Sequence, residues 1–381
     1  MVRKLVSIRR IADVRPIRGS PRMEMVLVDG WTCAVRAGDF DKNEIVVFFE
    51  IDSFLPPPTE DPRYNSTYNP MHHSGVNWQG QKGIHVKSVM VHNSTEISQG
   101  IVLKLEAFPE IRGVYTNLTN ELGPIAGEEK AMAMCFAEKL GVKKWRLPDA
   151  EAGVSLGQPP VCFPKTDIER VQNIKTLFSP KYSKAVFQES VKMDGSSMTV
   201  YYVKRSSQYY RSLPILDESA RADMDRGRIG VCSRNHDLSE KAGGKFWEMA
   251  LKYRLPRKLE RVGRNIAIQG ELVGSTICQN RHGFEKGDHD FFVYSIFDMD
   301  AQQYLDPREV EQRVSQLELK HVPVLGYVNI HDIASNHDDL LKRAEGTGLN
   351  GEKREGLVYK NVDDRRCFKV IANDYLLKHG E

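Results

Sequence analysis

Five short segments in the second half of the chain place a lysine, an arginine, a carboxylate or an aromatic ring within or beside a β-rich run. In chain order they are Lys192–Gly195, Ser233–Asn235, Gly270–Gly274, Phe291–Tyr294 and Glu355–Lys360, and Phe368-Lys369 follows them. A carboxylate inside an apolar strand is costly unless it is paired, hydrogen-bonded or bound to a metal. The series therefore constrains both the sheets that this half can form and the chemistry that they can carry.

The length of 381 residues predicts two domains, because single hydrophobic cores rarely grow beyond about 250–300 residues. Residues 1–156 show short strands and turns, including a hairpin signal at Asp29-Gly30 between two apolar runs. About five such strands favour an OB-type β-barrel with insertions, and a β-sandwich fits the pattern almost as well. Spacing of apolar residues also predicts a helix over Ala126–Leu140.

Residues 157–381 alternate predicted strands and helices and read as an α+β domain of antiparallel sheets with flanking helices. We expect strands at 184–191, 198–203, 265–273, 290–298, 356–360 and 367–371, and a linker over Gly153–Pro164. Lys245–Tyr253 has helical spacing, and Asp306 precedes a proline and a glutamate as a helix cap does.

Composition excludes several classes of protein. The six cysteines are scattered without a C-x-x-C pair, so neither a zinc ribbon nor a disulfide framework is expected. The N-terminal residues form no long apolar run, which predicts no signal peptide and no membrane partner. We therefore expect an intracellular protein, cytoplasmic or nuclear and not secreted. The net charge of +3 permits a nucleic-acid partner through a local basic groove without requiring one.

Lys192 is the candidate nucleophile. A lysine of ordinary pKa, near 10.4, is protonated at neutral pH, so we expect burial or a nearby cation to lower the pKa of this one. Asp194-Gly195 follows it in a turn whose backbone amides can approach a phosphate. Taken alone, the K-x-D-G pattern is weak, since an exposed lysine in a hairpin turn explains it equally well.

The other segments supply acids, an aromatic ring and cations. Glu271, inside an apolar strand, can bond ribose hydroxyls or metal-bound water. Glu355, at the mouth of another apolar strand, can hold a divalent cation with Asp194, directly or through water. Tyr294 offers a ring on which a base can stack. Arg234 and Lys369 are candidate phosphate ligands. Solvent-facing charge and core packing explain each of these residues singly, and only the ordered set points to a shared site.

The ordered set resembles the covalent nucleotidyltransferases, which comprise DNA ligases, RNA ligases and messenger-RNA capping enzymes. Residues Lys192–Gly195 look like motif I, Gly270–Leu272 like motif III, and Asp290–Phe297 like motif IIIa. Glu355–Val358 looks like motif IV and Phe368-Lys369 like motif V. Because the barrel-like region precedes the lysine, the chain is similar to the RNA ligase clade with an N-terminal OB domain, the fifth group. Phe163–Asp167 and Glu169–Asn173 also look like that clade.

The resemblance implies an ATP-dependent RNA ligase with an ATP-grasp-like nucleotidyltransferase domain at 157–381. Lys192 would form the lysyl-adenylate, and ATP would be the adenylyl donor. Mg²⁺ or Mn²⁺ would be held at Asp194, Glu271 and Glu355. The expected partners are RNA ends, nicked or duplex-bridged, and a monomer is expected. The nucleotide site would include Val191, Asp194, Gly195, Arg234, Glu271, Phe292, Tyr294 and Lys369.

Two positions depart from the family pattern. Motif V usually has two lysines separated by one residue, but the earlier position here is Cys367. Arg366 or Lys378 is a candidate source of the missing charge. The stacking position of motif IIIa is Tyr294 where phenylalanine is usual. The rival functions are a DNA ligase, a capping-type guanylyltransferase, and a non-catalytic OB-fold RNA-binding protein.

Overall fold

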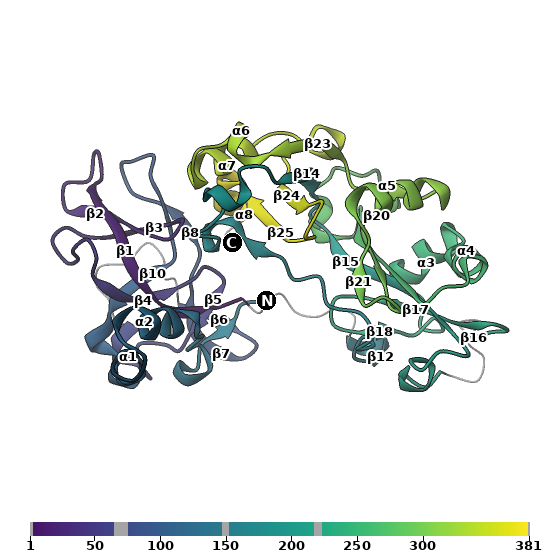
Figure 1. Ribbon diagram of the computed structural model, residues 1–381, viewed down its shortest axis with the longest axis horizontal. Helices are drawn as coiled ribbons and strands as arrows, with labels where there is room; N and C mark the ends of the chain where they lie inside the picture. Colours follow the sequence, from purple (N-terminus) through teal and green to yellow (C-terminus); the bar gives the residue numbers. More distant parts are fainter. Residues whose placement is uncertain (1–2, 65–74, 147–151, 217–222, 380–381) are drawn as a thin grey trace. The chain divides into compact units, whose positions relative to one another are not determined.

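The computed structural model describes residues 3–64, 75–146, 152–216 and 223–379. Its contacts divide the chain into two compact units (Figure 1). Unit 1 comprises residues 1–148, 170–176 and 373–381, and unit 2 comprises residues 149–169 and 177–372. The predicted division between residues 156 and 157 stays a prediction of domain organisation.

Unit 1 is built on a five-stranded antiparallel sheet in the order β10-β4-β1-β2-β3. Its strands are β1 (Val6–Pro16), β2 (Met23–Val28), β3 (Trp31–Arg36), β4 (Ile45–Phe49) and β10 (Ile101–Lys104). The predicted hairpin is confirmed: β2 pairs with β3, and Asp29 adopts the left-handed conformation, with φ of 53°, that this tight turn requires.

A smaller sheet and two helices complete this unit. The sheet has the order β11 (Lys143–Lys144), β5 (Ser53–Leu55), β7 (Gln81–His85) and β6 (Gly75–Trp78). A two-stranded sheet joins β8 (Ser88–Met90) to β9 (Ile97–Gln99). Helices α1 (Pro109–Leu122) and α2 (Pro124–Ala133) pack against each other, and the C-terminal helix α8 (Asn373–His379) contacts β8.

The helix predicted over Ala126–Leu140 is correct only in its first half. Helix α2 ends at Ala133, because Met134 is extended and the chain turns toward β1. There the backbone N–H of Phe136 donates to the carbonyl of Val6 at 2.8 Å. The apolar residues Phe136 and Leu140 are still buried in the core of unit 1. Burial was therefore predicted correctly, but the extended Met134 interrupts the helix and Glu138–Leu140 forms a separate 3₁₀ turn.

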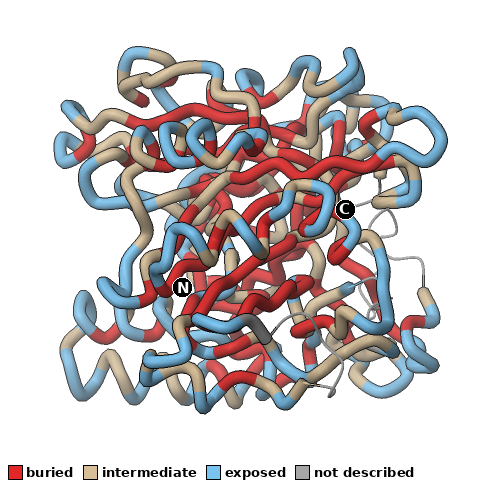
Figure 2. The backbone as a smooth tube through the Cα atoms, turned by 90° about the vertical axis from the view of Figure 1, so that its right-hand side faces the viewer, coloured by how far each residue is buried: buried red, intermediate tan, exposed pale blue. Residues whose placement is uncertain are grey.

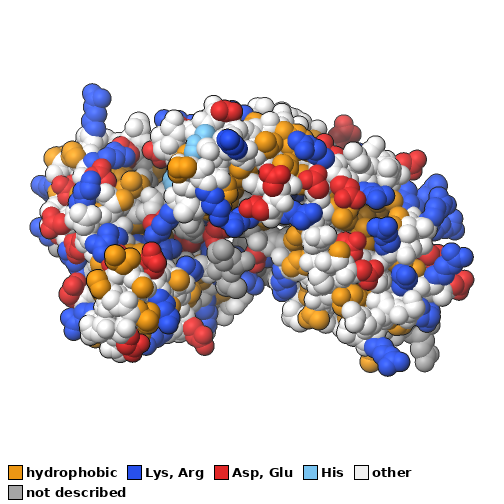
Figure 3. Space-filling model, in the orientation of Figure 1, with side chains coloured by type: hydrophobic (Ala, Val, Ile, Leu, Met, Phe, Trp, Pro, Cys, Tyr) orange, Lys and Arg blue, Asp and Glu red, His pale blue; other side chains and the backbone are white. Residues whose placement is uncertain are grey.

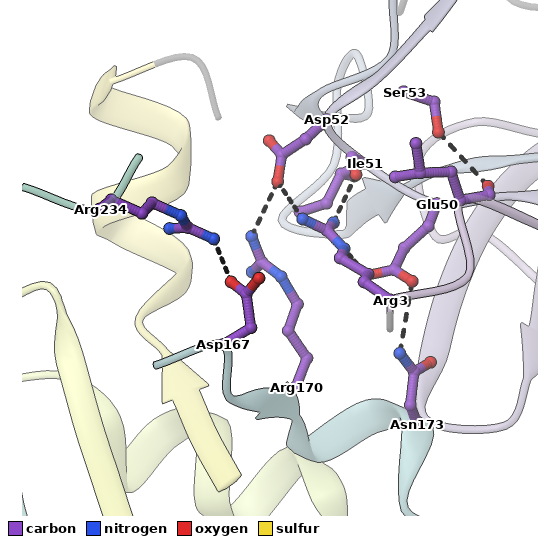
Figure 4. Close-up of polar contacts among 10 residues, drawn as sticks. Arg3, Glu50, Ile51, Asp52, Ser53, Asp167, Arg170, Asn173 and Arg234 are labelled. Atoms are coloured by element: carbon purple, nitrogen blue, oxygen red, sulfur yellow. Dashed lines mark hydrogen bonds and ion pairs between the residues drawn. The ribbon is translucent and has the colours of Figure 1, made fainter. Parts of the chain in front are cut away.

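A buried charged cluster attaches residues 170–176 to the barrel strands of unit 1 (Figure 4). Arg3 donates to Glu50 and to Asp52, both at 2.6 Å. Arg170 lies 3.3 Å from the Asp52 carboxylate, and Asn173 donates to Glu50 at 3.3 Å. Each carboxylate of this cluster therefore faces at least one guanidinium or amide.

Unit 2 contains a large, mainly antiparallel sheet in the order β12-β18-β17-β15-β19-β20-β21. Its strands are β12 (Ser155–Gly157), β18 (Asp237–Leu238), β17 (Gly227–Cys232), β15 (Ser196–Lys204), β19 (Ile266–Gly274), β20 (His289–Asp298) and β21 (Gln303–Tyr304). Two short strands, β16 (Asp223–Met224) and β22 (Lys320–His321), pair with β17 and β20.

A second sheet of unit 2 contains β25 (Cys367–Ile371), β24 (Gly356–Asn361), β14 (Val186–Lys192) and β23 (Val324–Asn329), in that order. The strands predicted in this half are confirmed, with ends that differ by a few residues. The short strand β13 covers Glu169–Arg170. Helices in this half are α3 (Lys245–Lys252), α4 (Leu255–Val262), α5 (Pro307–Gln316), α6 (Ile330–Ile333) and α7 (His337–Ala344).

The main core of unit 2 lies between one face of the large sheet and helices α3, α4 and α5. Buried segments follow the central strands (Figure 2). The predicted cap of α5 is confirmed, because the side chain of Asp306 accepts from the backbone N–H of Arg308 at 2.8 Å. In the described part of the chain, no helix combines the length and apolar character that crossing a membrane requires.

Candidate active site

The turn Met193–Gly195 joins the two sheets of unit 2. Lys192 is the last residue of β14 and lies opposite Gly356, directly after Glu355. After the three residues of this turn β15 begins at Ser196, and Ser197 lies opposite Glu271. The lysine of one sheet and a carboxylate of each sheet are thereby brought to the same junction, although they are separated by up to 163 residues along the chain.

Gly195 is required by the closeness of this junction. A Cβ atom at Gly195 would lie 2.3 Å from the carbonyl oxygen of Leu272 and 2.9 Å from Cγ of Glu271. Any side chain here would therefore push the turn away from β19. The backbone N–H of Gly195 also hydrogen-bonds the Glu271 carboxylate.

Lys192 forms an ion pair with Glu355, and its Nζ lies 2.7 Å from Oε2. Burial lowers the pKa of Lys192, but the neighbouring carboxylates of Glu355, Glu271 and Asp194 outweigh burial and raise that pKa above its ordinary value. Burial alone therefore does not give Lys192 a lowered pKa, and the effect of a nearby cation on that pKa stays a prediction. Burial is present as expected, but the acids around the amine reverse its effect.

Three carboxylates crowd this junction, where Lys192, Arg281 and Lys369 are the neighbouring cations. Burial, together with the charges of Glu355 and Asp194, raises the pKa of Glu271 to about 8. Burial and Asp194 likewise raise the pKa of Glu355. Within the described residues, no group of three or more His, Cys, Asp or Glu side chains is placed to hold a metal ion directly. The donor set fits a hydrated divalent cation, whose charge would relieve this crowding and whose water molecules would bridge to the acids.

Asp194 has two partners that sequence reasoning missed. Its carboxylate lies 3.0 Å from Nη1 of Arg281, and its backbone N–H donates to Nε2 of His282 at 3.0 Å. Both partners follow a short 3₁₀ turn, Cys278–Asn280, in which all three residues have positive φ. No glycine marks that turn, so only the basic character of residues 281 and 282 could have pointed to it.

Tyr294 is anchored by its hydroxyl group. The hydroxyl lies 3.0 Å from Oγ1 of Thr166 and 3.3 Å from Oγ of Ser197. Burial and the nearby Glu271 raise the pKa of Tyr294 to about 12, so the phenol is neutral. Val191 and Phe292 pack in a buried apolar cluster with Met193, Val273 and Val322. Their assignment to the nucleotide site stays a prediction.

Strand β25 carries Lys369 opposite Val358, and the charge of Lys369 acts on Glu355. Cys367 pairs with Lys360, a buried lysine that sequence reasoning missed. Burial lowers the pKa of Lys360 to about 8, and its Nζ donates to Oγ of Ser295 at 2.9 Å. Lys360 also donates to the carbonyl of Tyr294 and lies 5.4 Å from that ring's centroid.

The two candidate sources of the missing motif V charge differ. Arg366 donates to the hydroxyl of Tyr182 at 2.6 Å and lies 3.1 Å from the Asp364 carboxylate, so its guanidinium group already has partners outside the junction. Lys378 lies on α8 of unit 1. Within unit 2, Lys360 is the basic residue that pairs directly with Cys367.

Arg234 lies in the turn between β17 and β18 and forms an ion pair with Asp167 (Figure 4). Both side chains are about half exposed, at 44% and 54%. The structure thus brings together Lys192, Asp194, Glu271 and Glu355, with Lys369 and Tyr294 beside them. It holds Arg234 in a separate, exposed pair.

Comparisons with known proteins agree with this arrangement. The family model for RNA ligase matches residues 185–371, and a model of an OB-fold domain matches residues 5–105. Among curated proteins, none matches the chain. The predicted OB-type barrel is confirmed by the second match, and the sandwich alternative falls.

Solved structures of Naegleria gruberi RNA ligase match the whole chain. A mutant with ATP and Mn has 33% sequence identity and a TM-score of 0.80, with 100% of both chains covered. The form with PPi has 33% identity and a TM-score of 0.81, covering 100% of this chain and 99% of the other. A mutant with AMP and Mn has 33% identity and a TM-score of 0.81, covering 99% of each chain. The chain therefore belongs to the RNA ligase family, in the form that carries an N-terminal OB-fold domain.

Proposed function

We propose that this RNA ligase uses ATP to adenylylate Lys192 and then joins an RNA 3′-hydroxyl end to a 5′-phosphate end. The observation that carries the proposal is the junction of the two sheets, where Lys192 stands among Asp194, Glu271 and Glu355. The structures of the Naegleria gruberi enzyme with ATP and Mn, and with AMP and Mn, support ATP as donor and a divalent cation as cofactor.

The reaction consists of three phosphoryl transfers. The Nζ atom of Lys192 attacks the α-phosphorus of ATP, a P–N bond forms, and pyrophosphate leaves. The oxygen of an RNA 5′-phosphate then attacks the same phosphorus, and Lys192 leaves with its electron pair. Finally the RNA 3′-hydroxyl attacks the 5′-phosphate, a phosphodiester forms, its proton is released, and AMP leaves. Such transfers depend on positioning and on neutralising charge.

The residues of the junction prepare Lys192 for the first transfer. Its ion pair with Glu355 must be broken, and the ammonium group must lose a proton before it can attack. Asp194, Glu271 and Glu355 would hold a divalent cation, directly or through water, and its positive charge would favour the neutral amine of Lys192 and the departing pyrophosphate. Lys369 adds a fixed positive charge on the same side as Glu355.

The nucleotide-binding roles follow the same geometry. Tyr294 presents its ring for stacking on adenine, and Lys360 and Ser197 hold that strand and its hydroxyl in place. Gly195 lets backbone amides approach the α-phosphate. Arg234 is assigned to the ribose or the donor phosphate, which requires it to leave Asp167. Nicked or duplex-bridged RNA as the substrate, a monomeric state and an intracellular location remain parts of this proposal.

The test is incubation with α-labelled ATP or GTP and Mg²⁺, followed by addition of a nicked duplex. Labelled protein with ATP, and sealing of a nick with an RNA 3′-hydroxyl strand, are expected. A label from GTP alone would identify a capping-type guanylyltransferase. Sealing of DNA 3′-hydroxyl strands only would identify a DNA ligase. A folded protein that takes no label from either nucleotide, and carries none beforehand, would contradict the proposal.

A further inference from the structure

Positive charge in unit 2 is concentrated around helix α4. Residues 245–264 contain seven Lys or Arg and two Glu, a net charge of +5, whereas the whole chain carries +3. The rest of the chain is therefore slightly acidic. Figure 3 shows Lys and Arg side chains gathered at the right-hand end of the view, over α3 and α4 as placed in Figure 1.

Four arginines form an exposed row on this helix, which we call the α4 arginine stripe. Arg257 and Arg261 lie one turn apart on the helix, and Arg254 and Arg264 flank its two ends. All four residues are exposed. The row spans about 15 Å, at a rise of 1.5 Å per residue. Over that length a nucleic-acid duplex presents roughly nine phosphate charges.

The stripe is not neutralised by the protein. The neighbouring Lys258 pairs with Glu318 at 3.3 Å. None of the four stripe guanidinium groups has a hydrogen-bond or ion-pair partner among the residues that the structure describes. Arginine without an acidic partner is suited to phosphate, because its planar group donates two parallel hydrogen bonds.

Helix α4 lies on the face of the large sheet opposite the active site. Leu272 packs in the core beneath α3 and α4, whereas its neighbour Val273 packs with Val191 and Met193 beneath the motif I turn. Adjacent strand residues point to opposite faces, so Glu271 points away from α4. The stripe also adjoins the start of β19, about 17 Å along the strand from Glu271.

We propose that the α4 arginine stripe binds the phosphate backbone of RNA that flanks the junction to be sealed. The stripe is a second RNA-binding surface, separate from the site of phosphoryl transfer. It confers affinity without reading sequence, because contacts to phosphate carry no base information. This inference rests on the proposed RNA ligase function for the identity of the nucleic acid.

The test replaces Arg254, Arg257, Arg261 and Arg264 together by glutamine. The matched control replaces four exposed basic residues elsewhere in unit 2, Lys184, Lys241, Lys342 and Arg365, by glutamine, which changes the net charge equally. Binding of nicked RNA duplexes is measured without ATP across a salt series. One duplex has hairpin-closed arms of about 4 base pairs, which are shorter than the distance of about 17 Å from Glu271 to the stripe, and the other has arms of about 24, at roughly 3.4 Å per base pair.

For the stripe variant, the Kd of the long duplex is expected to rise about tenfold or more relative to the control variant. The slope of log K against log salt should fall in magnitude by about two to four. Binding of the short duplex and formation of the lysyl-adenylate should match the control. Equal Kd and slope in the two variants, or equal losses on both duplexes, would overturn the inference. Failure of the wild type to form a lysyl-adenylate would instead overturn the proposed function, since binding is measured separately.

Discussion

Each unit of the protein buries a cluster of charged side chains. The two clusters shift the pKa values of their carboxyl groups in opposite directions. In unit 1, Arg3 and Arg170 face Glu50 and Asp52. Burial there would raise the pKa of Asp52, but the two guanidinium groups outweigh it and hold that pKa well below its usual range. In unit 2, burial and neighbouring acids raise the pKa of Glu271 to about 8.

The difference separates a structural cluster from a functional one. In unit 1 two arginines neutralise two carboxylates, so this cluster needs no further cation. Its contacts instead hold Arg170 and Asn173 to Asp52 and Glu50. The junction in unit 2 has three carboxylates with Lys192, Arg281 and Lys369 as neighbouring cations, yet the pKa values of Glu271 and Glu355 stay raised. Such an arrangement is costly in the free protein and gains from a divalent cation, as catalytic sites often do.

The largest expected effect is at the functional cluster. Glu355→Ala should reduce lysyl-adenylate formation by about 10³-fold or more, because it removes the partner of Lys192 and one of the proposed ligands of the cation. The fold should be retained, and adenylylation by Glu352→Ala, an exposed neighbour, should match the wild type. Near-normal labelling of Glu355→Ala, followed on a denaturing gel, would move the cation site elsewhere.

At the structural cluster the opposite pattern is expected. Glu50→Ala should lower the free energy of unfolding by about 3 kcal/mol, because it removes one of the two carboxylates that pair with the buried Arg3. Denaturant unfolding measures this loss. Protein that remains folded should still form the lysyl-adenylate. A stable Glu50→Ala protein that fails to adenylylate would place this cluster in the catalytic machinery and remove the contrast.

A pH series sharpens the same contrast at Asp52. The pKa of Asp52 is lower in the folded protein than in the unfolded chain, so its ionised form stabilises the fold above the unfolded pKa. That contribution is lost as pH falls through the folded pKa. Asp52→Asn should therefore cost about 2 kcal/mol at pH 7 and progressively less below about pH 4. A cost that is constant from pH 7 to pH 3 would contradict the lowered pKa.

The smallest expected effect concerns Arg281, whose guanidinium group forms an ion pair with the Asp194 carboxylate. Arg281→Gln should lower the Mn²⁺ concentration that half-saturates the protein by about threefold to tenfold, because the guanidinium no longer competes for the carboxylate. Thermal shift with Mn²⁺ measures this without ATP. Lys286→Gln, an exposed change of equal charge in the same connection between β19 and β20, is the control. An unchanged or higher Mn²⁺ requirement would show that Arg281 does not compete with the cation.

The sequence predicted the elements of the site better than their surroundings. Alternation and turn signals located β14, β19, β20, β24 and β25, and the motifs identified the family. Contacts between distant segments leave no local signal in the sequence. The ion pair of Arg281 with Asp194 and the position of Lys360 opposite Cys367 on the neighbouring strand were therefore missed. The raised pKa of Lys192 was missed for the same reason, because it depends on acids from two other strands.

The helix that was predicted too long shows the same limit in the fold. Phe136 and Leu140 continue the helical spacing of α2, and both are buried. The backbone N–H of Phe136 instead donates to the carbonyl of Val6, 130 residues earlier in the chain, and Glu138–Leu140 forms a separate 3₁₀ turn. Periodicity reports burial, whereas the partner strand decides the conformation.

The most direct test of the central claim is to map the labelled residue after incubation with α-labelled ATP, with Mn²⁺ and with a chelator. From the cluster of Lys192 with Asp194, Glu271 and Glu355 we expect that AMP is attached to Lys192 and that attachment requires the cation. The Lys192→Ala variant should remain unlabelled. Appreciable label on Lys192→Ala would contradict the claim that Lys192 is the nucleophile. Appreciable label on the wild type in the chelator would contradict the claim that the neighbouring carboxylates act by binding a divalent cation.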